Sequence, residues 1–173
     1  MRNGFRKWLA VLAVLIIAAG LRFYRLDAQS FWNDEGNSAR IAERSLALIT
    51  EGAAGDIHPP LYYYLLHVWR GLFGASEFAL RSLSAVLGVL LVWLTYRIAR
   101  QVFDHTVGVV AALIAAINPF QIYYSQEARM YLLLAGIGAA ATSQLLSLLV
   151  VWSRRPQSNR SRLSFVIRHL SLV

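Results

Sequence analysis

An acidic pair, Asp34 and Glu35, lies in the long segment that separates the first two apolar runs of this 173-residue chain. A carboxylate within hydrogen-bond distance of a substrate hydroxyl can act as a general base, and a neighbouring carboxylate can orient the base or the substrate. The other interpretation is that both acids stabilise the first turn of a helix through its dipole, which is worth about 0.3–1 kcal/mol. Their spacing alone favours the helix-dipole interpretation.

Glu127 and Arg129 lie in a second polar segment, between two longer apolar runs. At the middle of a bilayer each charge would cost about 2.5–3.5 kcal/mol on insertion scales, and at the interface much less. Residues two apart do not face each other on a helix, so each needs another partner, which we expect the long polar segment or a charged ligand to supply. The other interpretation is that both residues anchor a helix end among lipid headgroups.

His58 stands before Pro59 and Pro60, and a run of nine residues dense in aromatic side chains, Leu61 to Trp69, follows. This run is too short to cross a membrane and suits a helix at the interface. His58 either contacts a substrate or caps the turn, and with His67 it does not have the spacing of a helical zinc pair. The chain has no Cys, which excludes thiolate zinc sites and cysteine nucleophiles.

The composition is that of a membrane protein. Hydrophobic residues make up 57% of the chain and charged residues 15%, against roughly 45–50% and about 25% in soluble domains. Such a chain has too much apolar surface to be disordered. The net charge is +8, and every basic residue except Lys7 is an arginine. The arginines lie at the ends of apolar runs and form no patch, which favours membrane topology over nucleic-acid binding.

Four membrane spans are predicted, at about residues 8–24, 78–97, 106–123 and 130–152. The first two include Arg22 and Arg81, whose side chains we expect to snorkel to the interface. Pro119 is predicted to bend or end the third span. The predicted fold class is therefore all-α, a polytopic transmembrane helical bundle. Small residues on the third and fourth spans favour close helix contact there.

The basic residues also predict an orientation. With the N-terminus in the cytoplasm, ten of the seventeen Lys and Arg residues lie inside, and residues 25–77 form a long outer loop. The first apolar run also has the basic start and small-residue site of a cleaved signal peptide, and this alternative stays open. Residues 1–152 are expected to form one membrane module, and residues 153–173 a basic cytoplasmic tail.

Two helices at the membrane interface are predicted within the outer loop. The first is expected to begin near Asn33, which would be its N-cap, and to reach about Thr50 with a weakly apolar stripe facing the bilayer. The second is the aromatic run from Leu61 to Trp69. Together they would cover the outer ends of the spans.

Four segments occur in an order and at separations that resemble a known family. They are Trp32-Asn33-Asp34-Glu35, His58-Pro59-Pro60-Leu61-Tyr62-Tyr63, Arg81-Ser82-Leu83-Ser84, and the stretch from Asn118-Pro119-Phe120 to Ser125-Gln126-Glu127-Ala128-Arg129-Met130-Tyr131. Over about residues 5–152 the chain resembles the N-terminal part of a GT-C superfamily membrane glycosyltransferase. It most resembles family 39, the protein mannosyltransferase and aminoarabinose transferase relatives. Because members of that family are several-fold longer, we expect this chain to be a piece or a truncated product of such an enzyme.

The resemblance implies a reaction and its catalytic residues. The donor would be a sugar linked to polyprenyl phosphate, transferred with inversion to an acceptor hydroxyl or amine on the extracytoplasmic side. By matched position, Asp34 is the expected general base, and Glu35 is expected to orient the acceptor or Asp34.

The same resemblance implies the substrate-binding residues. Arg129 is expected to hold the leaving phosphate, with His58 and Tyr62 as weaker candidates. Glu127 is expected to hold Arg129 or the acceptor. No cofactor and no metal are expected, although Asp34 with Glu127 could mimic the divalent-cation site of some superfamily members.

The expected partners are the lipid-linked donor, membrane lipid, and a glycan, lipid or protein acceptor, without nucleic acid. The expected location is the inner (plasma) membrane, as a multi-pass protein. An alternative function is a non-catalytic four-span protein that binds lipid-linked sugar or a partner. A third interpretation is a four-span protein without a site, which would tolerate substitution of Asp34, His58 and Arg129 alike.

Overall fold

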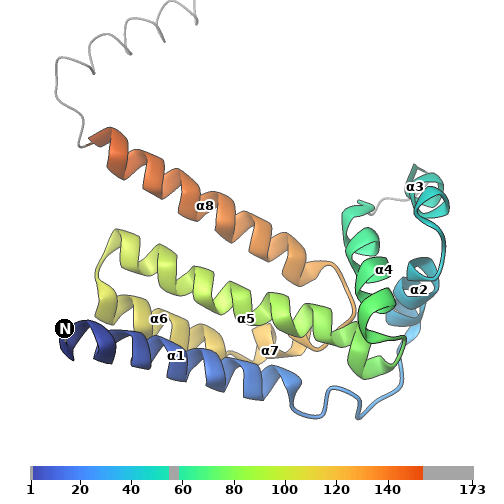
Figure 1. Cartoon of the computed structure of the whole chain (residues 1–173), viewed down its shortest axis with the longest axis horizontal. Coiled ribbons are helices and arrows are strands. Elements are labelled where there is room, and N and C mark those ends of the chain that lie inside the picture. The colour runs from blue at the N-terminus through green and yellow to red at the C-terminus, as the bar shows by residue number, and fades with distance from the viewer. Residues whose placement is uncertain (1, 55–58, 154–173) are drawn as a thin grey trace, which may run out of the picture.

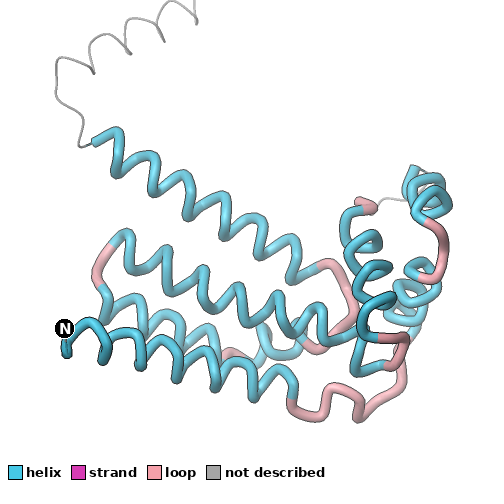
Figure 2. The backbone as a smooth tube through the Cα atoms, viewed as in Figure 1, coloured by secondary structure: helices cyan, strands magenta, loops and turns pink. Residues whose placement is uncertain are grey.

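The computed structural model describes residues 2–54 and 59–153, and the regular structure in those residues is entirely α-helical (Figure 1, Figure 2). The helices are α1 (Arg2–Phe23), α2 (Asn33–Ala42), α3 (Leu46–Ala54), α4 (Leu61–Phe73), α5 (Glu77–Val102), α6 (His105–Ile117), α7 (Pro119–Ser125) and α8 (Tyr131–Ser153). The predicted all-α class is confirmed for this part of the chain. His58 and residues 154–173 of the predicted tail lie outside the described residues.

Helix α5 is the centre of the bundle. It packs between α8 on one side and α1 with α6 on the other, and it also contacts α4 and α7 (Figure 1). A buried apolar cluster joins α1, α5 and α6, and its members are Val11, Val14, Ala18, Val92, Tyr96, Ala112, Ala115 and Ala116. The alanines of α6 allow its backbone to approach both neighbours closely, as the small residues of the third predicted span indicated.

Side-chain caps determine where two of the bundle helices begin. At the start of α5, the hydroxyl of Ser76 accepts a hydrogen bond from the Ala79 N–H at 3.2 Å. At the start of α6, the Asp104 carboxylate accepts one from the Val107 N–H at 2.9 Å. Each cap satisfies a backbone donor that has no partner within the helix. The 26 residues of α5 reach about 39 Å, which is enough to cross the hydrocarbon core.

Two described helices, α5 and α8, are long and apolar enough to cross a membrane, and α6 with α7 makes a third if the bent pair is one span. The bend between α6 and α7 is 62°, and Pro119 begins the second half, as predicted. Asn118 accepts a hydrogen bond from the Gln121 N–H at 3.1 Å and so starts α7. These helices support a multi-pass membrane protein. A fourth span over residues 8–24 stays a prediction.

The predicted outer loop contains three helices among its described residues rather than two. The helix expected from Asn33 to Thr50 is divided into α2 and α3, which a short turn separates. The Ser45 hydroxyl accepts a hydrogen bond from the Leu48 N–H at 3.4 Å and thereby favours a new helix start over continuation. The N-cap of α2 is Trp32 and not Asn33, without a side-chain hydrogen bond. The interfacial position of these helices stays a prediction.

Arg22 and Arg81 do not snorkel as predicted, because both side chains are buried in the protein. Arg22 of α1 donates from Nη1 to the Ala116 carbonyl at 3.0 Å and from Nη2 to the Ala115 carbonyl at 3.2 Å. These carbonyls lie in the last turn of α6, where the chain leaves the helix and has no N–H donor to offer them. A lipid environment cannot hydrate such carbonyls, so the arginine satisfies them from the neighbouring helix.

Candidate active site

Glu35 is the centre of a polar cluster at the end of the bundle where α2, the start of α5 and the turn between α7 and α8 meet. Its side chain is 1% exposed. The carboxylate accepts hydrogen bonds from Arg81 at 2.9 Å (Nε) and 2.6 Å (Nη2), and a third from the Ala128 N–H at 2.8 Å. A bidentate pair of this kind combines strength with fixed orientation. Glu35 therefore ties the outer segment to α5 and to the turn that carries Glu127 and Arg129.

Arg81 also organises the segment that leads into α2. Its Nη1 donates to the carbonyls of Leu26 at 2.9 Å and Gln29 at 2.7 Å, and its Nη2 to that of Ser30 at 3.3 Å. The guanidinium lies 5.2 Å from the centre of the Phe31 ring. No role in the site was predicted for Arg81. The signal available in the sequence was a charge in the second turn of an apolar helix, which must reach either the membrane interface or a partner within the protein.

Asp34, next to Glu35, has a very different environment. Its side chain is 43% exposed, and its Oδ2 lies 3.5 Å from Nη2 of Arg129, whose side chain is 7% exposed. Arg129 also donates from Nη1 to the Asp34 carbonyl at 3.4 Å and to the Ser38 hydroxyl at 3.5 Å. Its Nε has no hydrogen-bond partner within the described residues. The prediction that the outer loop supplies a partner for Arg129 is confirmed by this contact with Asp34.

Glu127 lies on the wall of a cavity of about 720 Å³ between the α1–α2 segment and α7. The wall also includes Trp32, Tyr123 and Gln126, together with the Glu35–Arg81 pair. Asp34 and Arg129 do not line this cavity. It combines aromatic faces with carboxylate and amide groups, a lining that can contact both apolar and polar parts of a ligand.

The pKa of Glu127 is raised, and the largest cause is burial. The neighbouring Glu35 and Asp34 carboxylates raise it further, whereas the Tyr123 hydroxyl and the Arg129 guanidinium lower it. The surroundings of Glu127 thus favour its protonated form more than water does. That form could donate a hydrogen bond into the cavity as well as accept one.

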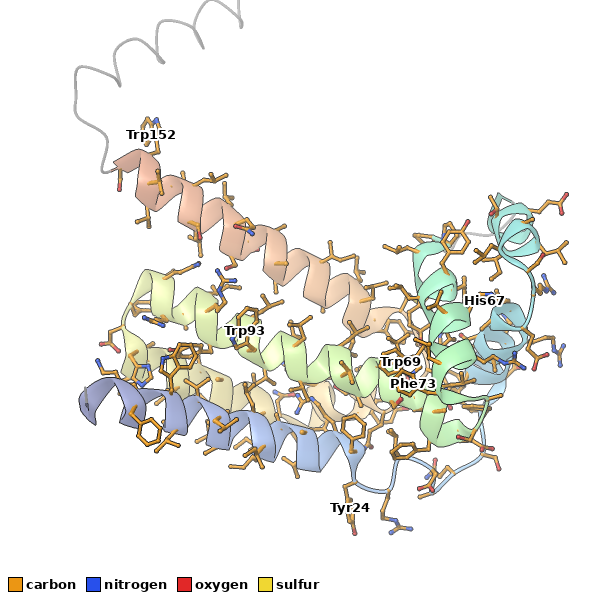
Figure 3. The ribbon with its side chains drawn as sticks, viewed as in Figure 1. Tyr24, His67, Trp69, Phe73, Trp93 and Trp152 are labelled. Carbon is orange, nitrogen blue, oxygen red and sulfur yellow. The ribbon has the colours of Figure 1, made fainter. Side chains whose placement is uncertain are left out.

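Tyr62, in α4, is fully buried, and its hydroxyl, near Ser84 of α5, has no hydrogen-bond partner among the residues that the structure describes. Burial raises its pKa, so the phenol stays neutral. Helix α4 is held against α2 by the ring of His67, labelled in Figure 3, whose Nδ1 lies 2.9 Å from the Ala42 carbonyl. Because His58 is outside the described residues, its predicted contact with substrate stays a prediction.

The structure brings Asp34, Glu35, Glu127 and Arg129 together in one cluster, although α2 and the α7–α8 turn are far apart in sequence. Tyr62 lies in the layer behind them. Within residues 2–54 and 59–153, no group of three or more His, Asp or Glu side chains is arranged to hold a metal ion. The catalytic and binding roles expected of these residues stay predictions.

Comparison with known proteins identifies a family whose sequence profile this chain matches. Residues 57–162 match the sequence profile of the dolichyl-phosphate-mannose-protein mannosyltransferase family. An uncharacterized protein of Aquifex aeolicus (strain VF5) is 33% identical over 104 residues, which are 56% of this chain and 20% of that protein. The chain thus spans well under two thirds of the length of this relative. No solved structure matches the chain.

Proposed function

We propose, from the premise that this chain belongs to the dolichyl-phosphate-mannose-protein mannosyltransferase family, that it is the N-terminal membrane module of a family 39 glycosyltransferase. The donor is a sugar on a polyprenyl phosphate, and the acceptor is a hydroxyl or amine on a glycan, lipid or protein. The site faces the extracytoplasmic side of the inner membrane, and the N-terminus lies in the cytoplasm.

The proposed reaction is one displacement at the anomeric carbon of the sugar. The acceptor oxygen or nitrogen forms a bond to that carbon while the bond from carbon to phosphate oxygen breaks, and the electron pair leaves with the phosphate. Attack from the face opposite the phosphate inverts the configuration. Asp34 takes the acceptor proton, and the leaving phosphate needs little acid catalysis because its second pKa is about 6.

The observation that carries the proposal is the contact of Asp34 with Arg129. It places an accessible carboxylate 3.5 Å from a buried guanidinium with an unpartnered Nε. This displacement requires a base for the acceptor and a cation for the leaving phosphate. Because the two act on opposite faces of the anomeric carbon, the 3.5 Å contact of Asp34 with Arg129 opens when the sugar lies between them. Arginine suits the second role because its planar donors match phosphate oxygens in pairs.

The other residues of the cluster support these two. Glu35 holds Asp34 and the Arg129 turn in place through its pair with Arg81, and acts as a positioning residue. Glu127 contacts the acceptor or the sugar from the cavity wall. Tyr62 supports the cluster from behind, and the exposed aromatic side chains of α4 and α7 lie along the polyprenyl chain.

The test measures transfer of labelled sugar from polyprenyl phosphate, in membranes that contain the protein as its source organism produces it. Asp34→Asn should lower the transfer rate by about 10²–10⁴-fold, because it removes the base and keeps the size of the side chain. Asp27→Asn, an exposed acid of the same outer segment, should leave the rate unchanged. Full transfer by the Asp34→Asn protein, inserted at the normal level, would overturn the assignment of the base.

A further inference from the structure

A second cavity, lined by basic and aromatic side chains, lies at the opposite end of the bundle from Asp34. It has a volume of about 170 Å³ and is lined by Lys7, Trp8, Tyr96, Arg100 and His105. These residues come from the N-terminal part of α1, the last turns of α5 and the first turn of α6, which meet at the end of the bundle marked by the N-terminus in Figure 1. With water occupying about 30 Å³ per molecule in the liquid, the cavity has room for a small anionic group.

The lining residues that the structure describes are basic or aromatic and include no carboxylate. Lys7 and Arg100 carry positive charge, and His105 adds a ring that can donate a hydrogen bond. The nearest acid in sequence, Asp104, uses a carboxylate oxygen to cap α6. The ion pairs of the described residues are those of Arg70, Arg81 and Arg129, so neither Lys7 nor Arg100 has an acidic partner among them.

A buried tyrosine positions two of the lining groups. The hydroxyl of Tyr96 lies 3.1 Å from Nδ1 of His105 and accepts a hydrogen bond from Nη1 of Arg100 at 3.3 Å. Its ring packs directly on Gly108, where a Cβ would lie 3.0 Å from the ring. Tyr96 therefore cannot shift without moving α6, and it holds the guanidinium and the imidazole at the cavity before any ligand arrives.

We propose that this cavity binds the phosphate of an anionic phospholipid from the leaflet at that end of the bundle. Basic pockets between membrane helices bind such headgroups, and arginine and lysine hold phosphate by charge-assisted hydrogen bonds. Trp8, on the rim, is 61% exposed, and an indole in that position is typical of the headgroup level of a membrane. The lipid would clamp the three helix ends together. In the orientation proposed above, the leaflet is the cytoplasmic one.

The proposal is tested by native mass spectrometry of the whole chain in detergent, titrated with dioleoyl-phosphatidylglycerol and with dioleoyl-phosphatidylcholine. We expect tighter binding of phosphatidylglycerol. Arg100→Gln and Lys7→Gln should each weaken that binding about fivefold, the usual effect of one basic residue near an anionic surface. Arg100→Lys keeps the charge and should keep most of the binding, which separates loss of the site from loss of the fold.

Arg97→Gln is the matched control, because Arg97 lies on the same end of α5 but packs over the Trp93 ring at 5.0 Å and does not line the cavity. It should bind phosphatidylglycerol as the unmodified chain does. Equal losses for Arg97→Gln and Arg100→Gln would overturn the site, since only general positive charge would then matter. Equal affinity for the two lipids, or full displacement of the lipid by inorganic phosphate, would overturn the lipid as its ligand. None of these results depends on glycosyl transfer.

Discussion

Two helices of the bundle each bury an arginine, and the two arginines are satisfied in different ways. Arg81 of α5 forms a bidentate pair with the Glu35 carboxylate and also binds three backbone carbonyls. Arg22 of α1 binds carbonyls alone, and its Nε has no partner within the described residues. Arg81 joins the outer segment to the bundle through an ion pair, whereas Arg22 donates hydrogen bonds to the unpaired carbonyls at the end of α6.

The difference indicates which region depends on a charge and which on hydrogen bonds. A buried ion pair fails badly when one partner is removed, because the other charge is left without compensation. An arginine that only caps carbonyls can be replaced at the cost of those hydrogen bonds, less the desolvation that the guanidinium no longer suffers. The Arg81 region should therefore be the more sensitive of the two to a single substitution.

The largest effect is expected for Glu35→Gln. It leaves Arg81 buried without a counter-charge and should lower the free energy of unfolding by about 3–5 kcal/mol. The measurement is thermal or denaturant unfolding of the chain in detergent. The control is Glu43→Gln, which removes an exposed pair with Arg70 at 3.2 Å and should cost less than about 1 kcal/mol. Equal costs for the two variants would contradict the structural role assigned to Glu35.

A smaller effect is expected for Arg22→Leu, which removes the donors to the Ala115 and Ala116 carbonyls. Hydrogen bonds to a charged group are worth about 1.5–3 kcal/mol, and the loss should fall in that range in the same unfolding assay. Amide hydrogen exchange at the end of α6 should rise as well. If stability is unchanged or higher, the desolvation of the guanidinium outweighs its carbonyl bonds, and the contrast with Arg81 is larger than proposed.

The smallest effect is expected for Gly88→Ala, in the same region as Arg22. A Cβ at this position of α5 would meet the Ser125 hydroxyl of α7 and lie 2.9 Å from Nε of Arg22. Overpacking of this kind costs about 1–3 kcal/mol. Gly138→Ala on α8 is the matched control, because a Cβ there meets nothing within 4 Å, and it should be neutral or slightly stabilising. A neutral Gly88→Ala would show that the three helices separate easily.

Asp34, Glu35, Glu127 and Arg129 were singled out from the sequence, whereas the part played by Arg81 and the pairing of the side chains were not. Glu127 and Arg129 stood out because charges between apolar runs are costly, and the partner expected for Arg129 in the outer loop proved to be Asp34. The neighbouring acids Asp34 and Glu35 look equivalent in a sequence. Helical geometry turns one toward Arg81 and the buried turn and leaves the other half-exposed.

Two local expectations failed for reasons that lie outside the local sequence. Arg22 was expected to reach the interface, but the broken end of α6, some 90 residues away, offers it carbonyls instead. The helix predicted from Asn33 to Thr50 divides at the turn before Ser45. Hydrophobic periodicity continued across that turn, and a single serine that competes for a backbone N–H is a weak signal beside it.

The sequence by itself determined that this is a helical membrane protein, that the chain bends at Pro119, and that charged residues near the ends of apolar runs need partners. Those properties follow from apolar run length, from the geometry of proline and from the cost of charge in lipid, all of which act locally. Only the tertiary structure decided that Glu35 is locked against Arg81, that Asp34 stays accessible beside Arg129, and that Arg22 caps α6. Those outcomes depend on which helix ends meet in space, and short-range sequence patterns do not encode contacts between distant segments.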